Sequence, residues 1–337
     1  MHSRISLSRI ATVAAALLLC LSSNFSAYAQ GQKLTPVRYE ETIRSLMFLP
    51  SYVALSKGYF KQEGLDVAMR TSQGTDKSTA ALVSGNADII LVGPEASVYV
   101  QTSESPLKPR IFAGVTATDG FFLVGRSAAQ KFNWATVKGK TILGLRPGST
   151  PDVFLEAALR KHGLDPRKDV KIVNNLGPAA RPGAWLAGQA DFGIFTEPDA
   201  TTLEKDGKTF VVASIGAEVG PVDYTVFTTT DAYMAKNPKV LQAWTNALAH
   251  AQADVANAPA ADLAKIAATY FPGTSQEQLV AVIERYRKIH FYKTTPLIDP
   301  AAIDRIQDML IASGLLQPAK RVSPQTILVT DFAKHVK

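Results

Sequence analysis

The sequence has almost no cysteine: Cys20 is the only one among 337 residues. It lies in a segment that is expected to be removed, so the mature chain would carry no thiol. A chain without cysteine forms no disulfide, no cysteine-rich zinc site and no cysteine nucleophile. It also suits an oxidising compartment, because nothing in it can mispair.

Long apolar runs are scarce as well. The stretch from Ile10 to Leu21 is the most apolar, and it is too short for a membrane helix, which needs about 18 or more apolar residues. Arg4 and Arg9 give it a basic flank, and Ala27-Tyr28-Ala29 follows as a cleavage site. Residues 1–29 are therefore predicted to be a cleavable secretory signal, and the mature protein is expected in the periplasm.

A lipid anchor and nucleic-acid binding are both disfavoured. The residue before a lipidated cysteine is normally small, whereas Leu19 precedes Cys20. Loss of residues 1–29 removes two of the 36 basic residues and none of the 29 acidic ones, which leaves a net charge of +5. The basic residues are spread along the chain with no run of three, unlike the clustered charge of a nucleic-acid binder.

Catalytic signatures are missing too. The five histidines show no metal-binding spacing such as H-E-x-x-H. The segment Gly144 to Thr150 resembles a P-loop, but it is one residue short and lacks the lysine that reaches the phosphates. Neither G-x-S-x-G nor G-x-G-x-x-G occurs. The sequence thus predicts no catalytic residue, no metal and no cofactor.

Short β-rich runs alternate with helical stretches, which predicts an α/β fold with mainly parallel sheets. The expected strands are Val37–Glu41, Val67–Arg70, Asp88–Val92, Arg110–Val115, Phe121–Gly125, Thr141–Leu145, Val170–Val173, Asp191–Phe195, Thr209–Ser214 and Tyr224–Thr228. The expected helices between them are Pro50–Glu63, Lys77–Ser84, Pro151–His162 and Arg181–Ala187. From about Asp231 onward only helices are expected, over Pro238–Asn257, Ala261–Tyr270, Ser275–Ile289 and Pro300–Ser313.

A weak internal repeat relates the two halves of the chain. Gly85-Asn86-Ala87-Asp88 in the first half matches Gly188-Gln189-Ala190-Asp191 in the second. The final aspartate of each motif follows an earlier aspartate at the same spacing: 22 residues separate Asp66 from Asp88, and 22 separate Asp169 from Asp191. Gly-x-Ala-Asp is also a common helix-to-strand turn, but the matched spacing favours a true repeat and hence two similar lobes.

The two lobes are not expected to be simply consecutive. Residues 30–119 would begin lobe 1, residues 120–225 would form lobe 2, and residues 226–337 would return to lobe 1 with the C-terminal helices packed on it. The chain would cross through Ala113–Thr118 and return through Val222–Thr228. Two crossing strands make a natural hinge that can close on a ligand.

Several predicted helix starts would meet at one edge of the sheets, where α/β proteins bind ligands. Ser149-Thr150-Pro151, Gly74-Thr75-Asp76 and Gly93-Pro94 each precede or begin a helix. Their free N–H groups attract anions or other acceptors. Arg44, in the loop after the first strand, could bind a carboxylate or sulfonate at two points.

Two acidic residues complicate an anion site. Glu95 and Glu197 occupy equivalent repeat positions at the cleft end of a strand. They could complement a helix dipole, or accept hydrogen bonds from N–H or O–H groups of a ligand and repel a small anion. The aromatic residues Phe48, Tyr224 and Trp185 could line the cleft for an organic ligand or belong to the core.

A set of short motifs is spread over about residues 36–290: Pro50-Ser51-Tyr52-Val53-Ala54, Lys57-Gly58-Tyr59-Phe60, Glu63-Gly64-Leu65-Asp66-Val67, Ser84-Gly85-x-Ala87-Asp88, Gly139-Lys140 and Gly148-Ser149-Thr150. In these motifs the sequence resembles a known family, the sulfonate/nitrate/taurine-type and thiamine-pyrimidine-type periplasmic binding proteins of ABC transporters.

The resemblance implies a type II periplasmic binding protein with two doubly wound α/β lobes and a two-strand hinge. It would be a monomer that delivers a small molecule to an ABC permease served by a cytoplasmic ATPase. Together, the family and the residue patterns place the ligand contacts at Arg44, Ser45, Phe48, Gly74, Thr75, Gly93, Pro94, Glu95, Thr118, Gly148, Ser149, Thr150, Glu197 and Tyr224.

Two functional hypotheses remain open at the level of the sequence. One is an exported solute-binding protein whose ligand is an organic sulfonate, an aromatic carboxylate or a pyrimidine-like heterocycle. The other is a periplasmic enzyme or a sensor-type ligand presenter on the same fold. The eukaryotic pyrimidine synthases of the superfamily carry a cysteine-rich motif, and a mature chain without cysteine cannot supply it.

Overall fold

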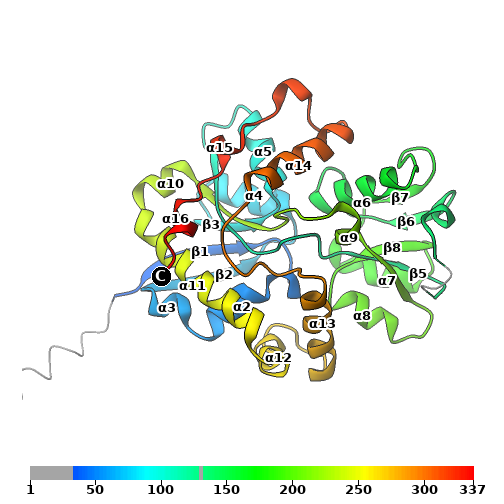
Figure 1. Ribbon diagram of the computed structural model, residues 1–337, viewed down its shortest axis with the longest axis horizontal. Coiled ribbons are helices and arrows are strands. Elements are labelled where there is room, and N and C mark those ends of the chain that lie inside the picture. Colours follow the sequence, from blue (N-terminus) through cyan, green and yellow to red (C-terminus); the bar gives the residue numbers. More distant parts are fainter. Residues whose placement is uncertain (1–32, 129–131) are drawn as a thin grey trace, which may run out of the picture. The chain divides into compact units, whose positions relative to one another are not determined.

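Ten strands form two five-stranded sheets in the part of the chain that the computed structural model describes, residues 33–128 and 132–337 (Figure 1). The first sheet has the order β2 (Leu65–Thr71), β1 (Thr35–Glu41), β3 (Ile89–Val92), β10 (Val226–Thr230) and β4 (Pro109–Gly114). The second has the order β7 (Lys171–Val173), β6 (Thr141–Leu143), β8 (Phe192–Phe195), β5 (Phe122–Gly125) and β9 (Phe210–Ser214). Each sheet with its helices is called a lobe below, lobe 1 for the first sheet and lobe 2 for the second.

The two sheets share one topology. In lobe 1, β1 pairs with β3 in parallel, and β10 runs antiparallel to both β3 and β4. In lobe 2, β6 pairs with β7 and β8 in parallel, and β5 runs antiparallel to both β8 and β9. The antiparallel strand of each sheet is the one that the chain enters by crossing from the other lobe. The sheets, which the sequence predicted to be mainly parallel, thus each contain one antiparallel strand.

The Gly-x-Ala-Asp repeat makes an equivalent hydrogen bond in each lobe. Asp88 accepts a hydrogen bond from the main-chain N–H of Arg38 at 2.8 Å, and Asp191 accepts one from that of Thr141 at 2.9 Å. In both lobes the aspartate thus joins the start of one strand to its parallel neighbour. The glycine three residues earlier has φ of +74° in both cases, a backbone conformation that favours glycine. The shared bonding is physical support for a true repeat.

Helices pack on both sheets. Lobe 1 carries α2 (Leu49–Ser56), α3 (Tyr59–Gln62), α4 (Thr75–Val83), α5 (Pro94–Thr102), α10 (Asp231–Lys236) and α11 (Pro238–Asn257). Lobe 2 carries α6 (Thr150–Lys161), α7 (Arg181–Leu186), α8 (Asp199–Glu204) and α9 (Ile215–Val219). The remaining helices are α12 (Ala260–Ala268), α13 (Gln276–Lys288), α14 (Pro300–Ala312), α15 (Pro324–Ile327) and α16 (Asp331–Lys334). Short 3₁₀ turns cover Leu46–Phe48, Trp134–Val137, Pro178–Ala180 and Pro318–Lys320.

One predicted helix is divided. The sequence suggests a single helix over Pro50–Glu63, whereas α2 and α3 are separate. Gly58 lies between them with φ of +71°, which a continuing right-handed helix cannot accommodate. The glycine therefore ends α2 and turns the chain into α3.

Each lobe has an aromatic core. In lobe 1 the ring of Trp244, on α11, lies 5.3 Å from that of Tyr39, 4.3 Å from Phe60 and 5.1 Å from Phe227. In lobe 2 the fully buried Trp185 donates its indole N–H to the hydroxyl of Thr209 at 2.9 Å. Trp185, which the sequence left open as a cleft or core residue, is thus a core residue.

Three segments lie side by side where the chain crosses between the lobes. The N–H of Val115 donates to the carbonyl of Thr225 at 2.9 Å, and that of Val222 donates to Ala117 at 2.8 Å. On the other edge the N–H of Ala117 donates to the carbonyl of Phe291 at 2.7 Å. The two crossing strands predicted from the sequence are present, and the segment after α13 adds a third that the sequence did not indicate.

The C-terminal helices contact both lobes. Helices α11 and α12 pack against α2 in lobe 1, as expected. Arg285 of α13 pairs with Glu197 at 2.6 Å and with Glu204 at 3.0 Å, both of which belong to lobe 2. Ser313, directly after α14, accepts a hydrogen bond from Arg160 of α6 at 3.0 Å. These charged contacts explain why α13 and α14 do not pack on lobe 1 alone.

Residues 36–337 form one compact unit, and both lobes belong to it. No helix within residues 33–128 and 132–337 combines the length and the apolar character needed to cross a membrane. The predicted secretory signal, residues 1–29, lies outside the described residues. The lobe boundaries at 119/120 and 225/226 stay predictions.

Candidate ligand-binding site

A cavity of about 540 Å³ lies between the two lobes. Lobe 1 lines it with residues around the starts of α4 and α5, lobe 2 with the loop that leads into α6, and the crossing segments with Phe121, Tyr224 and Thr225. The volume is in the range of pockets that enclose small organic molecules. Of the described residues that line it, three carry charge: Asp76, Glu95 and Arg146.

The first turns of three helices border this cavity. The residues that precede α4, α5 and α6 are Gly74, Gly93 and Ser149, and none of them caps its own helix with a side chain. The hydroxyl of Ser149 instead donates to the carbonyl of Arg146 at 2.7 Å. Uncapped first-turn N–H groups are free to bind acceptors.

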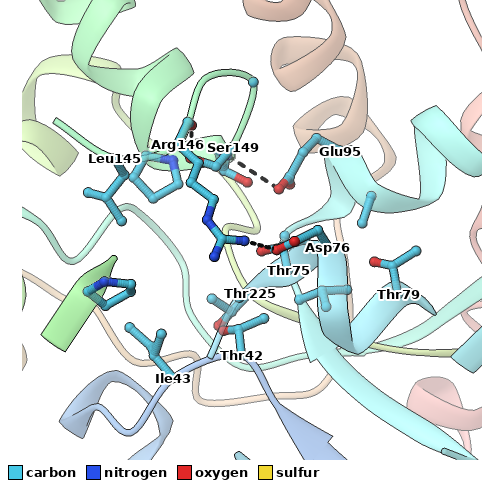
Figure 2. Close-up of a pocket in the computed structure, with 18 of the residues that line it drawn as sticks. Thr42, Ile43, Thr75, Asp76, Thr79, Glu95, Leu145, Arg146, Ser149 and Thr225 are labelled. Atoms are coloured by element: carbon cyan, nitrogen blue, oxygen red, sulfur yellow. Dashed lines mark hydrogen bonds and ion pairs between the residues drawn. The ribbon is translucent and has the colours of Figure 1, made fainter. Parts of the chain in front are cut away.

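The acid in the first turn of α5 reaches the start of α6 in the opposite lobe. Oε1 of Glu95 accepts a hydrogen bond from the main-chain N–H of Thr150 at 3.3 Å. Figure 2 shows this contact as the dashed line that ends at Glu95. The Glu95 side chain is 1% exposed, and burial raises the pKa of its carboxyl. One helix start is therefore capped by an acid from the other lobe.

Two further polar contacts join the lobes across the cavity. Arg146, in the loop before α6, forms an ion pair with Asp76 in the first turn of α4 (Figure 2). Their side chains are 42% and 63% exposed, so the pair lies at the mouth of the cavity. The hydroxyl of Tyr99 donates to the carbonyl of Gly148 at 2.9 Å. These contacts hold the two walls together.

The rest of the lining is largely apolar and aromatic. The lining includes the aromatic residues Phe48, Phe121 and Tyr224, and Leu145 and Leu176 from lobe 2. Burial raises the pKa of the Tyr224 phenol well above its usual value, so the hydroxyl stays protonated. Such walls suit the body of a small organic molecule, with a few polar groups to orient it.

Nine of the fourteen residues predicted from the sequence line this cavity. They are Phe48, Gly74, Thr75, Gly93, Glu95, Gly148, Ser149, Thr150 and Tyr224. The other five lie outside the lining: Arg44, Ser45, Pro94, Thr118 and Glu197.

Arg44 is held on the wall of lobe 1 by residues of that lobe. Its Nε lies 2.8 Å from Oε1 of the fully buried Glu41, and its Nη2 donates to Thr71 at 2.9 Å. The guanidinium also lies 5.6 Å from the ring centres of Tyr52 and Tyr270. This cation therefore compensates a buried carboxylate rather than facing the cavity.

Ser45 and Glu197 belong to the contact between the lobes. The hydroxyl of Ser45 accepts a hydrogen bond from the N–H of Met47 and donates to the carbonyl of Glu197 at 3.2 Å. The Glu197 carboxylate accepts hydrogen bonds from Thr201 and pairs with Arg285. Burial raises the pKa of this carboxyl, and the arginine opposes that rise.

Thr118 and Pro94 contribute to the fold and not to the cavity lining. The Thr118 hydroxyl donates to the carbonyl of Gly220 at 2.8 Å, within the crossing region. Pro94 lies in the first turn of α5 and is buried. Neither side chain lines the cavity.

Sequence reasoning missed Asp76 and Arg146 as a pair, and it missed Tyr99. Asp76 was visible only as part of the motif that precedes α4, and Arg146 only inside the segment rejected as a P-loop. In the described part of the chain, no three His, Cys, Asp or Glu side chains gather in a way that could hold a metal ion.

Comparison with known proteins identifies relatives over most of the chain. Residues 46–262 match the family described as "NMT1/THI5 like". A putative binding protein, YtlA, of Bacillus subtilis (strain 168) is 38% identical over 322 residues, which are 94% of this chain and 96% of that protein. A taurine-binding periplasmic protein of Escherichia coli (strain K12) is 27% identical over 208 residues, 60% of this chain and 62% of that protein.

Solved structures share the fold. The alkanesulfonate-binding protein SsuA of Xanthomonas axonopodis pv. citri, bound to MOPS, matches with a TM-score of 0.71 and 19% identity over 87% of this chain and 98% of its own. The periplasmic nitrate-binding protein NrtA of Synechocystis PCC 6803 matches with a TM-score of 0.72 and 17% identity over 90% of this chain and 88% of its own. The fold is that of the type II periplasmic binding proteins. The resemblance to sulfonate/nitrate/taurine-type binding proteins is confirmed, and the chain belongs to the NMT1/THI5-like family.

Proposed function

We propose that this protein is the exported solute-binding component of an ABC importer. It captures one small organic molecule in the cavity between the lobes and delivers it to a membrane permease. The single observation that carries the proposal is the cavity of about 540 Å³ into which both lobes contribute a helix start. A taurine-binding periplasmic protein among its relatives, and a solved structure of the same fold that is the ligand-binding component of an ABC-type import system, support the same role here.

Capture in this proposal uses motion of the lobes. Residues 120–225 move as lobe 2 against residues 30–119 and 226–337, and the crossing segments bend. A ligand that contacts both walls binds the closed arrangement more tightly and shifts the population toward it. The permease then recognises the closed form. Residues 1–29 direct export to the periplasm and are removed.

The protein acts as a binder and leaves the ligand chemically unchanged. The lining includes the Arg146–Asp76 ion pair and the contact of Glu95 with the start of α6, polar groups that can orient a bound molecule. A bound compound is thus expected to be recovered with its mass unchanged. Recovery of a converted product would favour the alternative of a periplasmic enzyme.

The ligand is an organic sulfonate, an aromatic carboxylate or a pyrimidine-like heterocycle. The start of α4, which no side chain caps, favours an anionic group, whereas Glu95 occupies the start of α6. The buried Glu95 and the absence of Arg44 from the lining favour a ligand with hydrogen-bond donors. Apolar walls favour an organic body over a bare inorganic ion such as nitrate.

A thermal-shift screen tests the proposal. Residues 30–337 are unfolded and refolded to remove any ligand bound during expression, then screened against sulfonates, aromatic carboxylates, nitrate and aminopyrimidines. A ligand at 100 times its Kd stabilises the native state by about 2.7 kcal/mol. For about 300 residues this raises the melting temperature by about 4 °C.

A variant that fills the cavity shows where a compound binds. Leu145 lines the cavity and is labelled in Figure 2, so Leu145→Trp should abolish the shift. Leu186→Trp is the matched control, because Leu186 is 61% exposed on α7 and does not line the cavity. Shifts that survive in Leu145→Trp, or no shift across the whole panel, would refute binding in this cavity.

A further inference from the structure

One carboxyl group of the protein fills the place in front of two helix starts at the cavity. Oε1 of Glu95 accepts the N–H of Thr150 at the start of α6 at 3.3 Å. The same group lies in front of α5, since a Cβ built on Gly93 would be 2.0 Å from Oε2 of Glu95. Glu95 is 1% exposed. An anionic ligand therefore finds the starts of α5 and α6 already occupied.

The start of α4 has an acid of its own. Asp76 lies in the first turn of this helix, and a Cβ built on Gly74 would be 2.6 Å from Oδ1 of Asp76 and 2.8 Å from Nη1 of Arg146. The ion pair between these two side chains thus lies directly beside the start of α4 (Figure 2). An anion that approached the N–H groups of α4 would meet the carboxylate of Asp76 at short range and be repelled.

The described lining residues supply no cation that lacks a counter-charge. Arg146 is the one basic side chain among them, and Asp76 neutralises it. Arg44, the other cation expected near the ligand, lies outside the lining and pairs with the buried Glu41. Burying an anion is unfavourable unless a partner offsets its loss of water. A sulfonate or carboxylate in this cavity could obtain such a partner only by displacing Asp76 from Arg146.

Uncharged polar groups are available in the cavity instead. Thr42, Gln73 and Thr75 line it, and none of the three is fully buried. Their hydroxyl and amide groups both donate and accept hydrogen bonds without carrying charge. Together with the aromatic rings of Phe48 and Tyr224 in the same lining, they match a neutral ring compound that has donors and acceptors at its edge.

We infer that the ligand is an uncharged organic molecule, a heterocycle or an amide, and that the Asp76–Arg146 pair makes the cavity selective against organic anions. The inference rests on the proposed function and selects one of the ligand classes that it leaves open. It also gives the ion pair a part in specificity, because a ligand gains nothing from a negative charge while Asp76 neutralises Arg146.

Pairs of compounds that differ by one charge test the inference. Refolded protein is titrated at neutral pH with nicotinamide and nicotinate, and with benzenesulfonamide and benzenesulfonate, by calorimetry and thermal shift. Within each pair the ring is the same and the head group is similar in shape. In at least one pair the neutral compound should bind at least tenfold more tightly than the anion, and its binding should be lost in Leu145→Trp.

A charge variant tests the part played by the ion pair. Asp76→Asn keeps the size of the side chain but leaves Arg146 without its counter-charge, so both anions should bind it at least tenfold more tightly than they bind the wild type. Asp66→Asn is the matched control, because it removes the same charge at an exposed position of β2 outside the cavity lining. This control should change every affinity less than twofold.

The outcomes separate the inference from the proposed function. An anion that binds the wild type as tightly as its neutral partner, with binding lost in Leu145→Trp, overturns the inference and leaves the proposed function standing. Anion affinities that stay within twofold of wild type in Asp76→Asn overturn the selectivity assigned to the ion pair. If no compound of either pair binds, the inference fails, and the wider screen above decides the proposed function separately.

Discussion

We expect Asp152 to make the stability of the folded protein depend on pH. It lies in the first turn of α6, is 5% exposed, and its Oδ2 accepts the N–H of Gly148 at 2.9 Å. Burial raises its pKa from 3.8 to about 6. The folded protein therefore holds this proton more tightly than the unfolded chain does.

The sign of the effect follows from that difference. The stabilisation from the protonated carboxyl is fully present below about pH 4 and is lost as the pH rises toward 6, after which stability levels off. Each pH unit between the two pKa values corresponds to about 1.4 kcal/mol, so the loss is about 3 kcal/mol. In Asp152→Asn the side chain cannot ionise and still offers an acceptor to Gly148.

Thermal melts of ligand-free protein between pH 4 and pH 8 measure this. Relative to the wild type, Asp152→Asn should gain about 5 °C in melting temperature between pH 4 and pH 7. Other buried carboxyls titrate in both proteins, and the difference between the two curves removes them. Asp66→Asn, at an exposed position of β2, is the control. A difference between Asp152→Asn and wild type that stays within 1 °C from pH 4 to pH 8 would show that Asp152 does not titrate as described.

Two ion pairs that join the lobes should affect the stability of the protein to different extents when their arginine is replaced by alanine. Arg146→Ala removes the contact with Asp76 at the cavity mouth, and because both side chains are partly exposed the free energy of unfolding should fall by less than about 1 kcal/mol. Its effect should appear instead as faster ligand release in stopped-flow measurements, reproduced in wild type by high salt, and an unchanged release rate would argue against a closing role. Arg285→Ala leaves the fully buried Glu197 without its cation and should cost about 3 kcal/mol in urea denaturation at pH 8, the low end for a broken buried pair because the Arg285 side chain is itself 32% exposed. The cost should shrink as the pH is lowered, since burial raises the pKa of Glu197 and protonation removes the unpaired charge, and a cost that does not change with pH would contradict this interpretation.

Local sequence patterns predicted the strands and the longer helices, but not the short helices α8, α9, α10, α15 and α16 or the break between α2 and α3. All ten expected strands are present within a few residues, because apolar, β-branched runs such as Asp88–Val92 are bounded by turn residues. Helix α11 has the bounds that were predicted, with proline in its first turn and its apolar side buried against lobe 1. These signals are local, so one sequence suffices to read them.

Relations between distant residues were harder to predict. Nothing local indicates that β10 enters lobe 1 antiparallel, or that the segment around Phe291 pairs with Ala117 in the crossing region. Arg285 and Glu197 lie 88 residues apart, and their ion pair explains why α13 contacts lobe 2. Such contacts depend on the tertiary arrangement of the lobes.

The candidate site was likewise predicted where it depends on local sequence, and not where it depends on contacts between distant residues. Helix starts at the sheet edge were predicted from the glycine, serine and proline residues that precede or begin each helix, and those around Gly74, Gly93 and Ser149 do line the cavity, although none of these three residues caps its helix with a side chain. Arg44 and Glu197 carry the right chemistry at the right strand ends, but each is held by a partner of opposite charge. Whether a charged side chain faces a ligand or a neighbour cannot be read from its position in the sequence.

The most direct test is a crystal structure of refolded protein with a compound that shifts its melting temperature. We expect one molecule in the cavity bordered by the starts of α4, α5 and α6, in contact with residues of both lobes. A compound bound elsewhere, for example in the groove lined by Arg126 and Lys140 of lobe 2, with the cavity unoccupied, would contradict the proposed function.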